Sequence, residues 1–367
     1  MQDIGRSKRA EKAYSFDDVA IVASRRTRER EDVDLTWRID AVTLDFPFVA
    51  APMDSCMSPA AAIAMGRLGG LGVINLEGLW TRYAEPQPIL DELAAIADKA
   101  RATRRLQEVY AAPIDPGLIR QRLAEIRASG QWVAGSLSPK NVLQFGQVIE
   151  QAAPDFFVIR GTLVSAEHVV SQGTPLDLKR FIRGLDVPVI VGGCANYHTA
   201  LHLMRAGAAG VLVGFGGGAR HATLSVLGVE VPMATAIADA AEARRDYLDE
   251  SGGRYVQVIA DGSLGGSGDI AKALALGADA VMLGAPLARA AEAPGQGYHW
   301  GAEAWHPRLP RGWRSHVGQI GTLEEILVGP SRRADGSMNL VGALSQTLAS
   351  TGYTDIKSFQ RAELVLL

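Results

Sequence analysis

The amino-acid sequence predicts a TIM barrel, an α/β fold in which eight parallel strands alternate with helices. Three observations lead to this prediction. Short, continuous apolar runs recur along the 367-residue chain, each ends in a polar or glycine-rich turn, and each is followed by an alanine- and leucine-rich helical stretch. Continuous apolar runs are typical of parallel strands that are buried on both faces. Eight such units in about 250 residues favour a closed barrel over an open doubly wound sheet, which is the alternative.

The expected strands are distributed over most of the chain, and we predict a single TIM-barrel domain over residues 1–367. The strands cover residues 47–53, 71–75, 131–136, 155–160, 187–192, 209–214, 255–261 and 280–284. Helices are expected over 197–206 and 270–276. Gly207 and Gly277 come directly after these stretches, and glycine just past a helix is a C-cap signal.

Two regions depart from this alternation. Residues 76–130, after the second strand, are rich in Ala, Leu, Glu and Arg and predict a helical insertion of two or three helices. The tail, residues 288–367, begins with a Gly-, Pro-, Trp- and His-rich loop over 292–314, whose length predicts a lid or an oligomer contact. Its aromatic and histidine side chains at 298–300 and 305–307 lack metal-ligand spacing. They are expected to pack within the lid, with base stacking as the alternative.

The charge balance provides no basis for binding nucleic acid or membrane surfaces. The chain has 37 Lys and Arg against 40 Asp and Glu, a net charge of −3, and its basic run over 24–30 is balanced by nearby acidic residues. Two cysteines form neither a disulfide framework nor a metal motif, which fits a reducing, cytoplasmic compartment. The polar N-terminus is neither a signal peptide nor a membrane span, and no apolar run approaches the ~18 residues that a spanning helix needs.

In a barrel of this kind, functional residues lie at the C-terminal ends of the strands. Asp261 ends the seventh expected strand and precedes a glycine-rich turn. Its carboxylate can accept from two ribose hydroxyls, while the loop amides after the last two strands hold a phosphate. The alternative is a plain turn in which Ser267 or Asp269 caps the next helix. The other strand ends supply Asp54, Asn75, Ser136, Arg160, Cys194, residues 214–223 and Gly284.

The segment 211–223 is an apolar strand run followed by four glycines in five residues and then a basic pair. Such glycine density lets the backbone approach a ligand and direct N–H groups at an anion. Arg220 can pair with a phosphate, His221 can shuttle protons, and Thr223 can orient a water or cap a helix. The alternative places the basic pair at a solvent-exposed rim. Cys56 and Cys194 are more typical of small packing residues than of reactive thiols.

Several motifs in the expected order resemble the IMP dehydrogenase/GMP reductase family, and the resemblance covers nearly the whole chain. It is closest to actinobacterial paralogues of IMP dehydrogenase that lack CBS domains and the catalytic cysteine. Residues 76–130 are too short for a CBS module. The motifs are Tyr14–Val19, Ala51–Ser55, Leu68–Ile74, Val211–Thr223, Ile259–Gly262 with Ser267–Ala273, Val281–Gly284 and Glu292–Gly295.

The resemblance implies a purine nucleoside 5′-monophosphate as substrate and a homotetramer. Asp261 would bind the ribose, and Gly262, Ser263, Gly284 and Ala285 the phosphate, with Gly218, Ala219, Ser55 and Met53 also at the substrate. It implies NAD(H) or NADP(H) near Arg160 and Asn196. The carbonyls of Gly214 and Gly216 would coordinate a potassium ion.

The chain departs from the family pattern where the chemistry would occur. His221 stands where the nucleophilic cysteine is expected, and Arg160 stands where an Asp would hold the nicotinamide ribose. Ala219 replaces a phosphate-binding serine, Ser263 a loop glycine, and Cys194 a cofactor-facing Asn. The lid also lacks the Arg-Tyr pair that activates water in IMP dehydrogenases. Three hypotheses stay open: an oxidoreductase-like enzyme with an altered site in which His221, Thr223, Arg220 and Cys194 are catalytic candidates, a catalytically silent nucleotide-binding or regulatory protein, and a sugar-phosphate enzyme.

Overall fold

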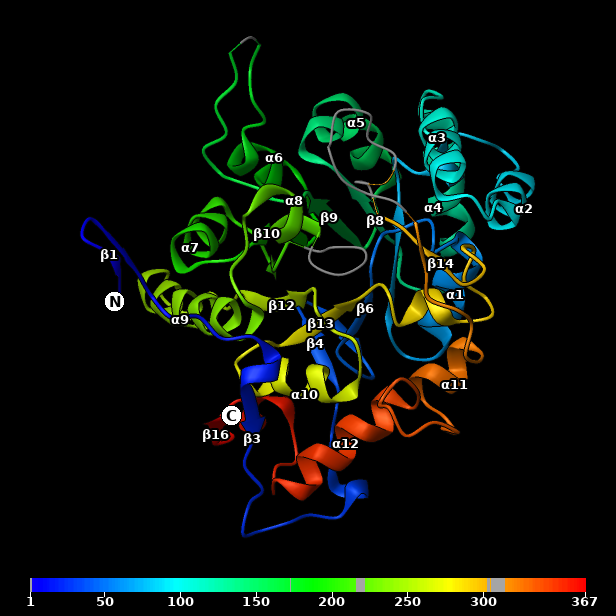
Figure 1. Cartoon of the computed structure of the whole chain (residues 1–367). Coiled ribbons are helices and arrows are strands. Elements are labelled where there is room, and N and C mark those ends of the chain that lie inside the picture. The colour runs from blue at the N-terminus through cyan, green and yellow to red at the C-terminus, as the bar shows by residue number, and fades with distance from the viewer. Residues whose placement is uncertain (1, 172, 216–221, 302–303, 305–313) are drawn as a thin grey trace.

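Eight parallel strands close into a barrel in the computed structural model, which describes residues 2–171, 173–215, 222–301, 304 and 314–367 (Figure 1). Each strand pairs with the next, and the last pairs with the first. The predicted TIM barrel is therefore confirmed, with every expected strand in place. The strands are β6 (Phe48–Ala50), β7 (Leu71–Asn75), β8 (Ala134–Leu137), β9 (Phe156–Arg160), β10 (Val189–Cys194), β11 (Gly210–Val213), β12 (Gln257–Asp261) and β13 (Ala280–Leu283).

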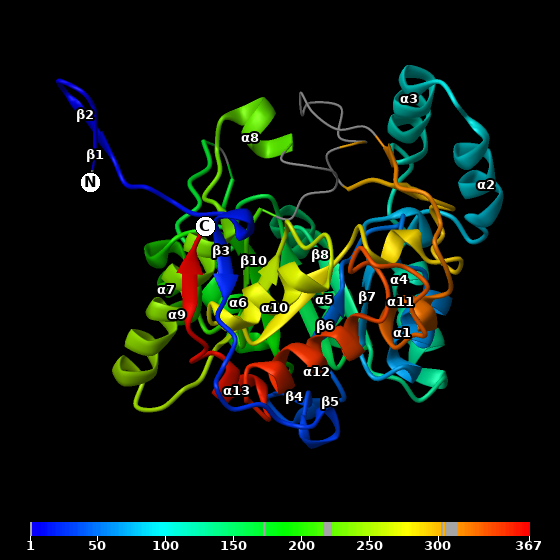
Figure 2. The same ribbon diagram turned by 60° about the horizontal axis from the view of Figure 1, so that its bottom comes forward.

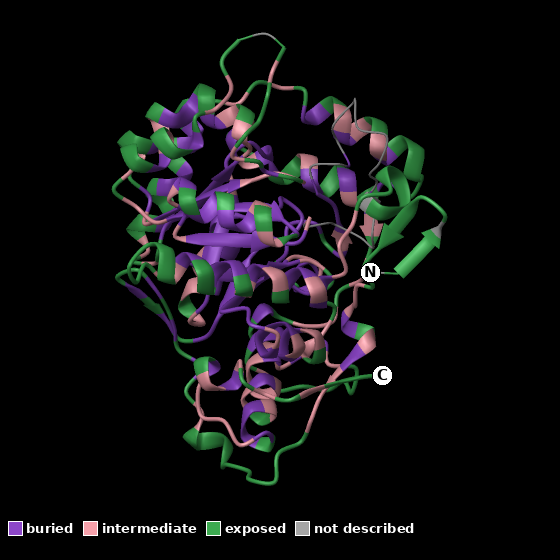
Figure 3. Ribbon diagram, turned by 90° about the vertical axis from the view of Figure 1, so that its left-hand side faces the viewer, coloured by how far each residue is buried: buried purple, intermediate pink, exposed green. Residues whose placement is uncertain are grey.

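Helices surround the barrel and bury its outer face. Nearly every strand residue is buried, as the purple centre of Figure 3 shows. This explains the continuous apolar runs, because both faces of each strand exclude water. The surrounding helices are α1 (Pro59–Arg67), α4 (Pro116–Ala128), α5 (Pro139–Ala152), α6 (Leu178–Gly184), α7 (Tyr197–Ala206), α9 (Met233–Glu250), α10 (Ser267–Ala275) and α12 (Leu340–Ser350).

Local signals in the sequence set several helix ends. Ser58 caps α1 by accepting from the Ala61 amide, and Pro59 takes the first helical position. The helix expected over 197–206 has those bounds, and Gly207 after it adopts a φ of 108°, the left-handed conformation that glycine favours. α10 ends at Ala275 with Leu276 as its C-cap, and Gly277 after it has a φ of 116°.

The insertion after β7 forms three helices, as predicted, but they differ in role. α4 packs against α1 and α5 as part of the barrel's outer layer. α2 (Gln87–Ala95) and α3 (Lys99–Val109) stand to one side of the mouth and have a small core of their own (Figures 1 and 2). That core includes Leu106 and Tyr110 from the insertion together with Trp300 from the tail. The insertion and the C-terminal tail are thus joined by shared apolar packing.

The chain termini pair with each other beside the barrel. β3 (Val19–Ile21), preceded by the 3₁₀ helix η1 (Phe16–Asp18), pairs antiparallel with β16 (Leu364–Leu366). Before them, the hairpin of β1 (Gln2–Gly5) and β2 (Lys8–Ala10) extends away from the barrel (Figure 2).

The N-terminal end of the barrel is covered by the hairpin of β4 (Trp37–Ile39) and β5 (Val42–Leu44), where Trp37 Nε1 donates to Gln257 at the start of β12. No helix in the described ranges is long and apolar enough to cross a membrane. The remaining short elements are η2 (Arg30–Asp32), η3 (Leu79–Thr81), α8 (Ala222–Leu227), η4 (Leu287–Arg289), β14 (Tyr298–His299), β15 (Ser315–His316), α11 (Leu323–Leu327) and α13 (Ile356–Phe359).

Candidate functional site

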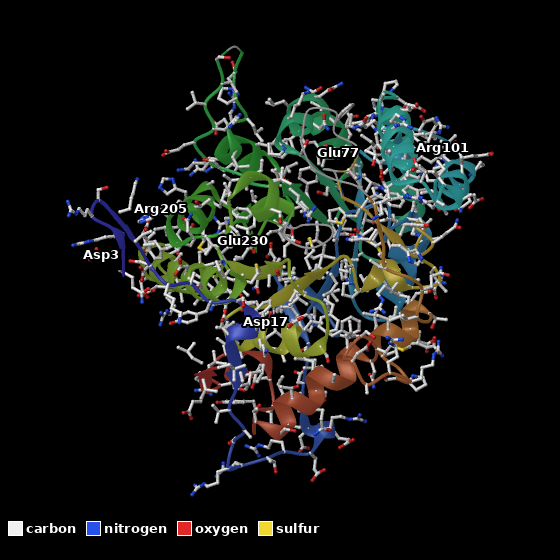
Figure 4. The ribbon with its side chains drawn as sticks, viewed as in Figure 1. Asp3, Asp17, Glu77, Arg101, Arg205 and Glu230 are labelled. Atoms are coloured by element: carbon white, nitrogen blue, oxygen red, sulfur yellow. The ribbon has the colours of Figure 1, made fainter. Side chains whose placement is uncertain are left out.

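The polar residues predicted at the strand ends gather at one end of the barrel. A pocket opens there above β6 to β9, between the barrel and the segment that carries Trp300. Glu77 contributes from just after β7, and its carboxylate accepts from the Ser138 hydroxyl at 2.8 Å, at the start of α5 (Figure 4). Fixed polar groups in a concave site are what a small-molecule pocket requires. The predicted strand-end residues lining the pocket are Asp54, Asn75, Ser136 and Arg160, with Met53 beside them.

Arg160 and Asp261 form an ion pair across the barrel mouth. Arg160 Nε lies 2.9 Å from Asp261 Oδ2, and Nη2 lies 3.3 Å from Oδ1. The Arg160 side chain is 15% exposed and the Asp261 side chain 5%. Arg160, which the resemblance places at the cofactor, is therefore paired with Asp261, which it places at the ribose. Arg160 presents only hydrogen-bond donors, unlike the carboxylate that the resemblance implies at the end of β9.

The loop after β12 follows Asp261 directly, and β13, whose Met282 pairs with Asp261, leads into the second loop; both loops remain partly accessible. Ser263 is exposed and has a φ of 55°, a conformation that favours glycine, while Gly284 and Ala285 are half-buried. Asp269 does not cap α10, and neither does Ser267, because the cap residue is Gly266. Instead Asp269 Oδ2 accepts from the Gly265 amide at 3.0 Å. The backbone N–H of Gly265, just before α10, is therefore already bonded to a carboxylate.

Both cysteines are buried thiols. Cys194 donates to the Leu212 carbonyl at 3.4 Å, and Cys56 to the Ala51 carbonyl at 3.3 Å. Burial raises the pKa of each thiol to about 12. The placement of Cys194 thus does not support the catalytic role considered for it, because the thiolate is the reactive form. Asn196 is exposed and caps α7 by accepting from the Thr199 amide at 2.9 Å, which accounts for it structurally.

The glycine-rich loop is described only in part. Gly216, Gly218, Ala219, Arg220 and His221 lie outside the described residues, and so does the side chain of Thr223, whose backbone belongs to α8. Gly214 is described: its φ is 113° and its carbonyl packs against Gly193 so closely that a side chain at 193 would collide with it.

A buried carboxyl network forms part of the pocket wall, and the sequence did not predict it. Asp54 Oδ2 accepts from the Tyr110 hydroxyl, the Leu79 amide and Asn75. Trp300 Nε1 in turn donates to the Tyr110 hydroxyl at 3.0 Å. Asp54 Oδ1 has no partner in the described part of the chain, and burial raises the pKa of Asp54 to about 6. The strand end identified Asp54, but nothing in the sequence linked it to Tyr110.

A second network connects Ser55 to the tail. Ser55 Oγ lies 3.0 Å from His299 Nδ1, donates to the Trp300 carbonyl and accepts from the Trp300 amide. Burial and the charge of Arg160 lower the pKa of His299 to about 4. Ser55, predicted to touch substrate, is thus fully buried and bonded to the tail instead. Trp300 packs in the small core shared by the insertion and the tail.

The fold and the site together define a TIM-barrel protein with a pocket lined by polar residues at the C-terminal end of its strands. A family model, IMP dehydrogenase / GMP reductase domain, matches residues 13–308. The chain belongs to that family, which confirms the resemblance read from its motifs.

Relatives and a solved structure agree with this assignment. Proteins named uncharacterized oxidoreductase from Mycolicibacterium smegmatis and Mycobacterium tuberculosis are 50% and 49% identical over the full length of both chains. An inosine-5′-monophosphate dehydrogenase of Methanocaldococcus jannaschii is 29% identical, covering 78% of this chain and 74% of its own. The crystal structure of an IMP dehydrogenase/GMP reductase-like protein from Corynebacterium glutamicum superposes with a TM-score of 0.95 at 51% identity, covering 100% of this chain and 97% of that one.

Proposed function

We propose that this protein binds a purine nucleoside 5′-monophosphate at its barrel mouth and acts on it as an oxidoreductase-like enzyme with an altered active site. The observation that carries the proposal is the position of Asp261. It is a nearly buried carboxylate at the end of β12, followed directly by the accessible Gly262 and Ser263. A carboxylate for ribose hydroxyls next to loop amides for a phosphate suits a sugar-phosphate ligand.

The ion pair with Arg160 is compatible with that role. A carboxylate has about four lone-pair positions, and two N–H donors from Arg160 leave others for ribose hydroxyls. Arg160 also compensates the charge of a side chain that water barely reaches, and so holds it in place. The proposal includes the potassium ion and the homotetramer that the resemblance implies, and the cytoplasmic location that the cysteine content favours. Light scattering tests the tetramer.

Two observations favour a second candidate function, a catalytically silent purine-nucleotide-binding or regulatory protein. Both cysteines of the chain are buried thiols, and Arg160 offers no acceptor to a nicotinamide ribose. The covalent route of the family requires a thiolate, and its hydride transfer requires a bound dinucleotide. Measurable turnover of any purine nucleotide by the purified protein contradicts this second candidate.

Calorimetric titration tests the proposal. The protein is titrated with IMP, XMP, GMP and AMP, each with and without NAD(H) and NADP(H), and with ribose 5-phosphate. Nucleotide binding that weakens about tenfold or more in Asp261→Asn supports the proposal, because a hydrogen bond to a charged group contributes about 1.5–3 kcal/mol. Asp249→Asn, which removes an exposed carboxylate, is the control. Binding of ribose 5-phosphate as tight as that of every nucleotide points to a sugar-phosphate enzyme, and absence of nucleotide binding refutes the proposal.

A further inference from the structure

His299 is a buried titratable residue that the proposed function does not use. It ends β14 in the C-terminal tail and is 1% exposed, yet it lies in the barrel mouth rather than in the outer packing of the lid. Its ring is fixed at one side only. Nδ1 lies 3.0 Å from Ser55 Oγ, and no other hydrogen bond of the ring is found within the described ranges. Nε2 is therefore the nitrogen left for a ligand.

The other edge of the ring faces the loop that follows β13. A Cβ at Gly284 would lie 3.4 Å from His299 Cε1, 3.5 Å from Nε2 and 3.5 Å from the Met53 sulfur. The ring edge thus borders the space beside Gly284 that a side chain would fill. In TIM barrels the loops after the last two strands commonly hold a phosphate. His299 is the imidazole presented to that loop from outside the barrel strands.

Part of the anion-binding capacity before α10 is already used. Asp269 occupies the Gly265 amide before α10, so a carboxylate stands where a helix N-terminus would otherwise attract an anion. Arg160 lies near enough for its positive charge to act on the His299 ring. A neutral imidazole with Nε2 protonated is a good donor to a phosphate oxygen in a poorly hydrated site.

The geometry points to a role for His299 and Ser55 in binding the nucleotide, and this inference rests on the proposed function. We propose that His299 Nε2 donates a hydrogen bond to the 5′-phosphate of the bound nucleotide, and that Ser55 is the positioning residue that holds the ring. Ser55 Oγ accepts from the Trp300 amide in either state. Its single proton goes to the Trp300 carbonyl or to Nδ1. Rotation of this hydroxyl onto Nδ1 leaves the imidazole proton on Nε2, facing the phosphate.

Two matched substitutions at His299 test the contributions of its two ring nitrogens separately. His299→Asn keeps a polar atom near Ser55 but removes the distal donor, whereas His299→Gln places an amide N–H near the position of Nε2. We expect Asn to weaken binding of IMP and GMP about tenfold to a hundredfold and to leave inosine and guanosine binding unchanged. Gln should retain nucleotide affinity within about threefold of wild type. Thermal melting confirms that each variant is folded.

Three results overturn the inference: unchanged nucleotide binding in His299→Asn, equal losses for nucleotide and nucleoside, or a Gln variant as weak as Asn. If wild-type protein binds no nucleotide, the proposed function fails, and inorganic phosphate then decides the inference. In ¹⁵N–¹H spectra of the histidine rings, the signal that is missing in His299→Gln belongs to His299. A shift of this signal when phosphate is added supports the phosphate contact. A His299 signal that phosphate leaves unmoved refutes it.

Discussion

Arg160 and Asp261 reach each other across the mouth of the barrel, from the ends of β9 and β12, two strands that are not neighbours in the sheet. Their ion pair joins two residues to which the resemblance assigns separate roles, one toward a cofactor and one toward a ribose. Because both side chains are largely removed from water, each charge depends on the other. Removing one partner leaves a poorly solvated charge, and this costs more than the net contribution of the intact pair.

This dependence predicts a non-additive double-mutant cycle. Arg160→Met and Asp261→Asn should each lower the free energy of unfolding, by about 3 kcal/mol for Arg160→Met, which leaves the carboxylate charged and unpaired. The double variant should be more stable than Arg160→Met, because the lone carboxylate charge is gone. Urea unfolding of the four proteins measures the cycle. Additive losses in the double variant would show that the two charges do not depend on each other.

Asp54 predicts a pH-dependent stability with a definite sign. Its pKa is raised from 3.8 to about 6, so the folded state holds the proton more tightly than the unfolded state. The contribution of Asp54 to stability is fully present below about pH 4 and is lost as the pH rises through about 6. The expected loss is about 3 kcal/mol. Asp54→Asn keeps an acceptor for Tyr110 and Leu79 and removes the titration.

Urea unfolding between about pH 4 and pH 8 checks this prediction. Asp54→Asn should exceed wild type in stability at the upper end and match it more closely at the lower end. Asp249→Asn removes an exposed carboxylate and serves as the control, with a profile parallel to that of wild type. Parallel profiles for Asp54→Asn and wild type would mean that Asp54 titrates normally.

The fold was predictable because barrel burial leaves a direct pattern in the chain. Val158 and Val191 belong to strands covered on both faces, so their neighbours in sequence are apolar as well. Asp261 could be identified for the same reason: it ends one of these runs and precedes glycines. Both signals lie within short stretches of sequence, so they can be recognised without knowledge of tertiary contacts.

The contacts within the site were not predictable, because packing between distant segments creates them. Asp54 and Tyr110 are 56 positions apart, Arg160 and Asp261 are 101 apart, and Ser55 and His299 are 244 apart. Tyr110 comes from the insertion and His299 from the tail, so only their meeting over the barrel mouth gives them a role. The sequence therefore identified which strand ends carry polar groups, but not how those groups pair.

Burial of both thiols predicts that the native protein resists thiol reagents. Cys56 and Cys194 are each fully buried, and their raised pKa keeps them protonated near neutral pH. A thiol-specific chromogenic reagent should label neither in the native protein and both after unfolding in urea. Cys194→Ala should leave nucleotide affinity unchanged. Rapid labelling of a native cysteine that is lost in Cys194→Ala would restore that residue as a reactive candidate.

Asp279 predicts a stability effect that is separate from the site. It lies just before β13, at the end of the barrel opposite the pocket, and accepts from Arg244 at 2.7 Å and the Val258 amide at 2.8 Å. Tyr255, Lys357 and Gln360 also donate to it, which ties the C-terminal helix α13 and its C-cap to the barrel.

Asp279→Ala leaves Arg244 buried without its carboxylate and should cost about 3–5 kcal/mol. Nucleotide affinity, measured where the variant is still folded, should match wild type because the two sites are at opposite ends of the strands. Arg245→Ala, at an exposed position on the same helix as Arg244, is the control and should cost little. A stable Asp279→Ala protein, or one that is folded but binds nucleotide weakly, would contradict this separation of stability and function.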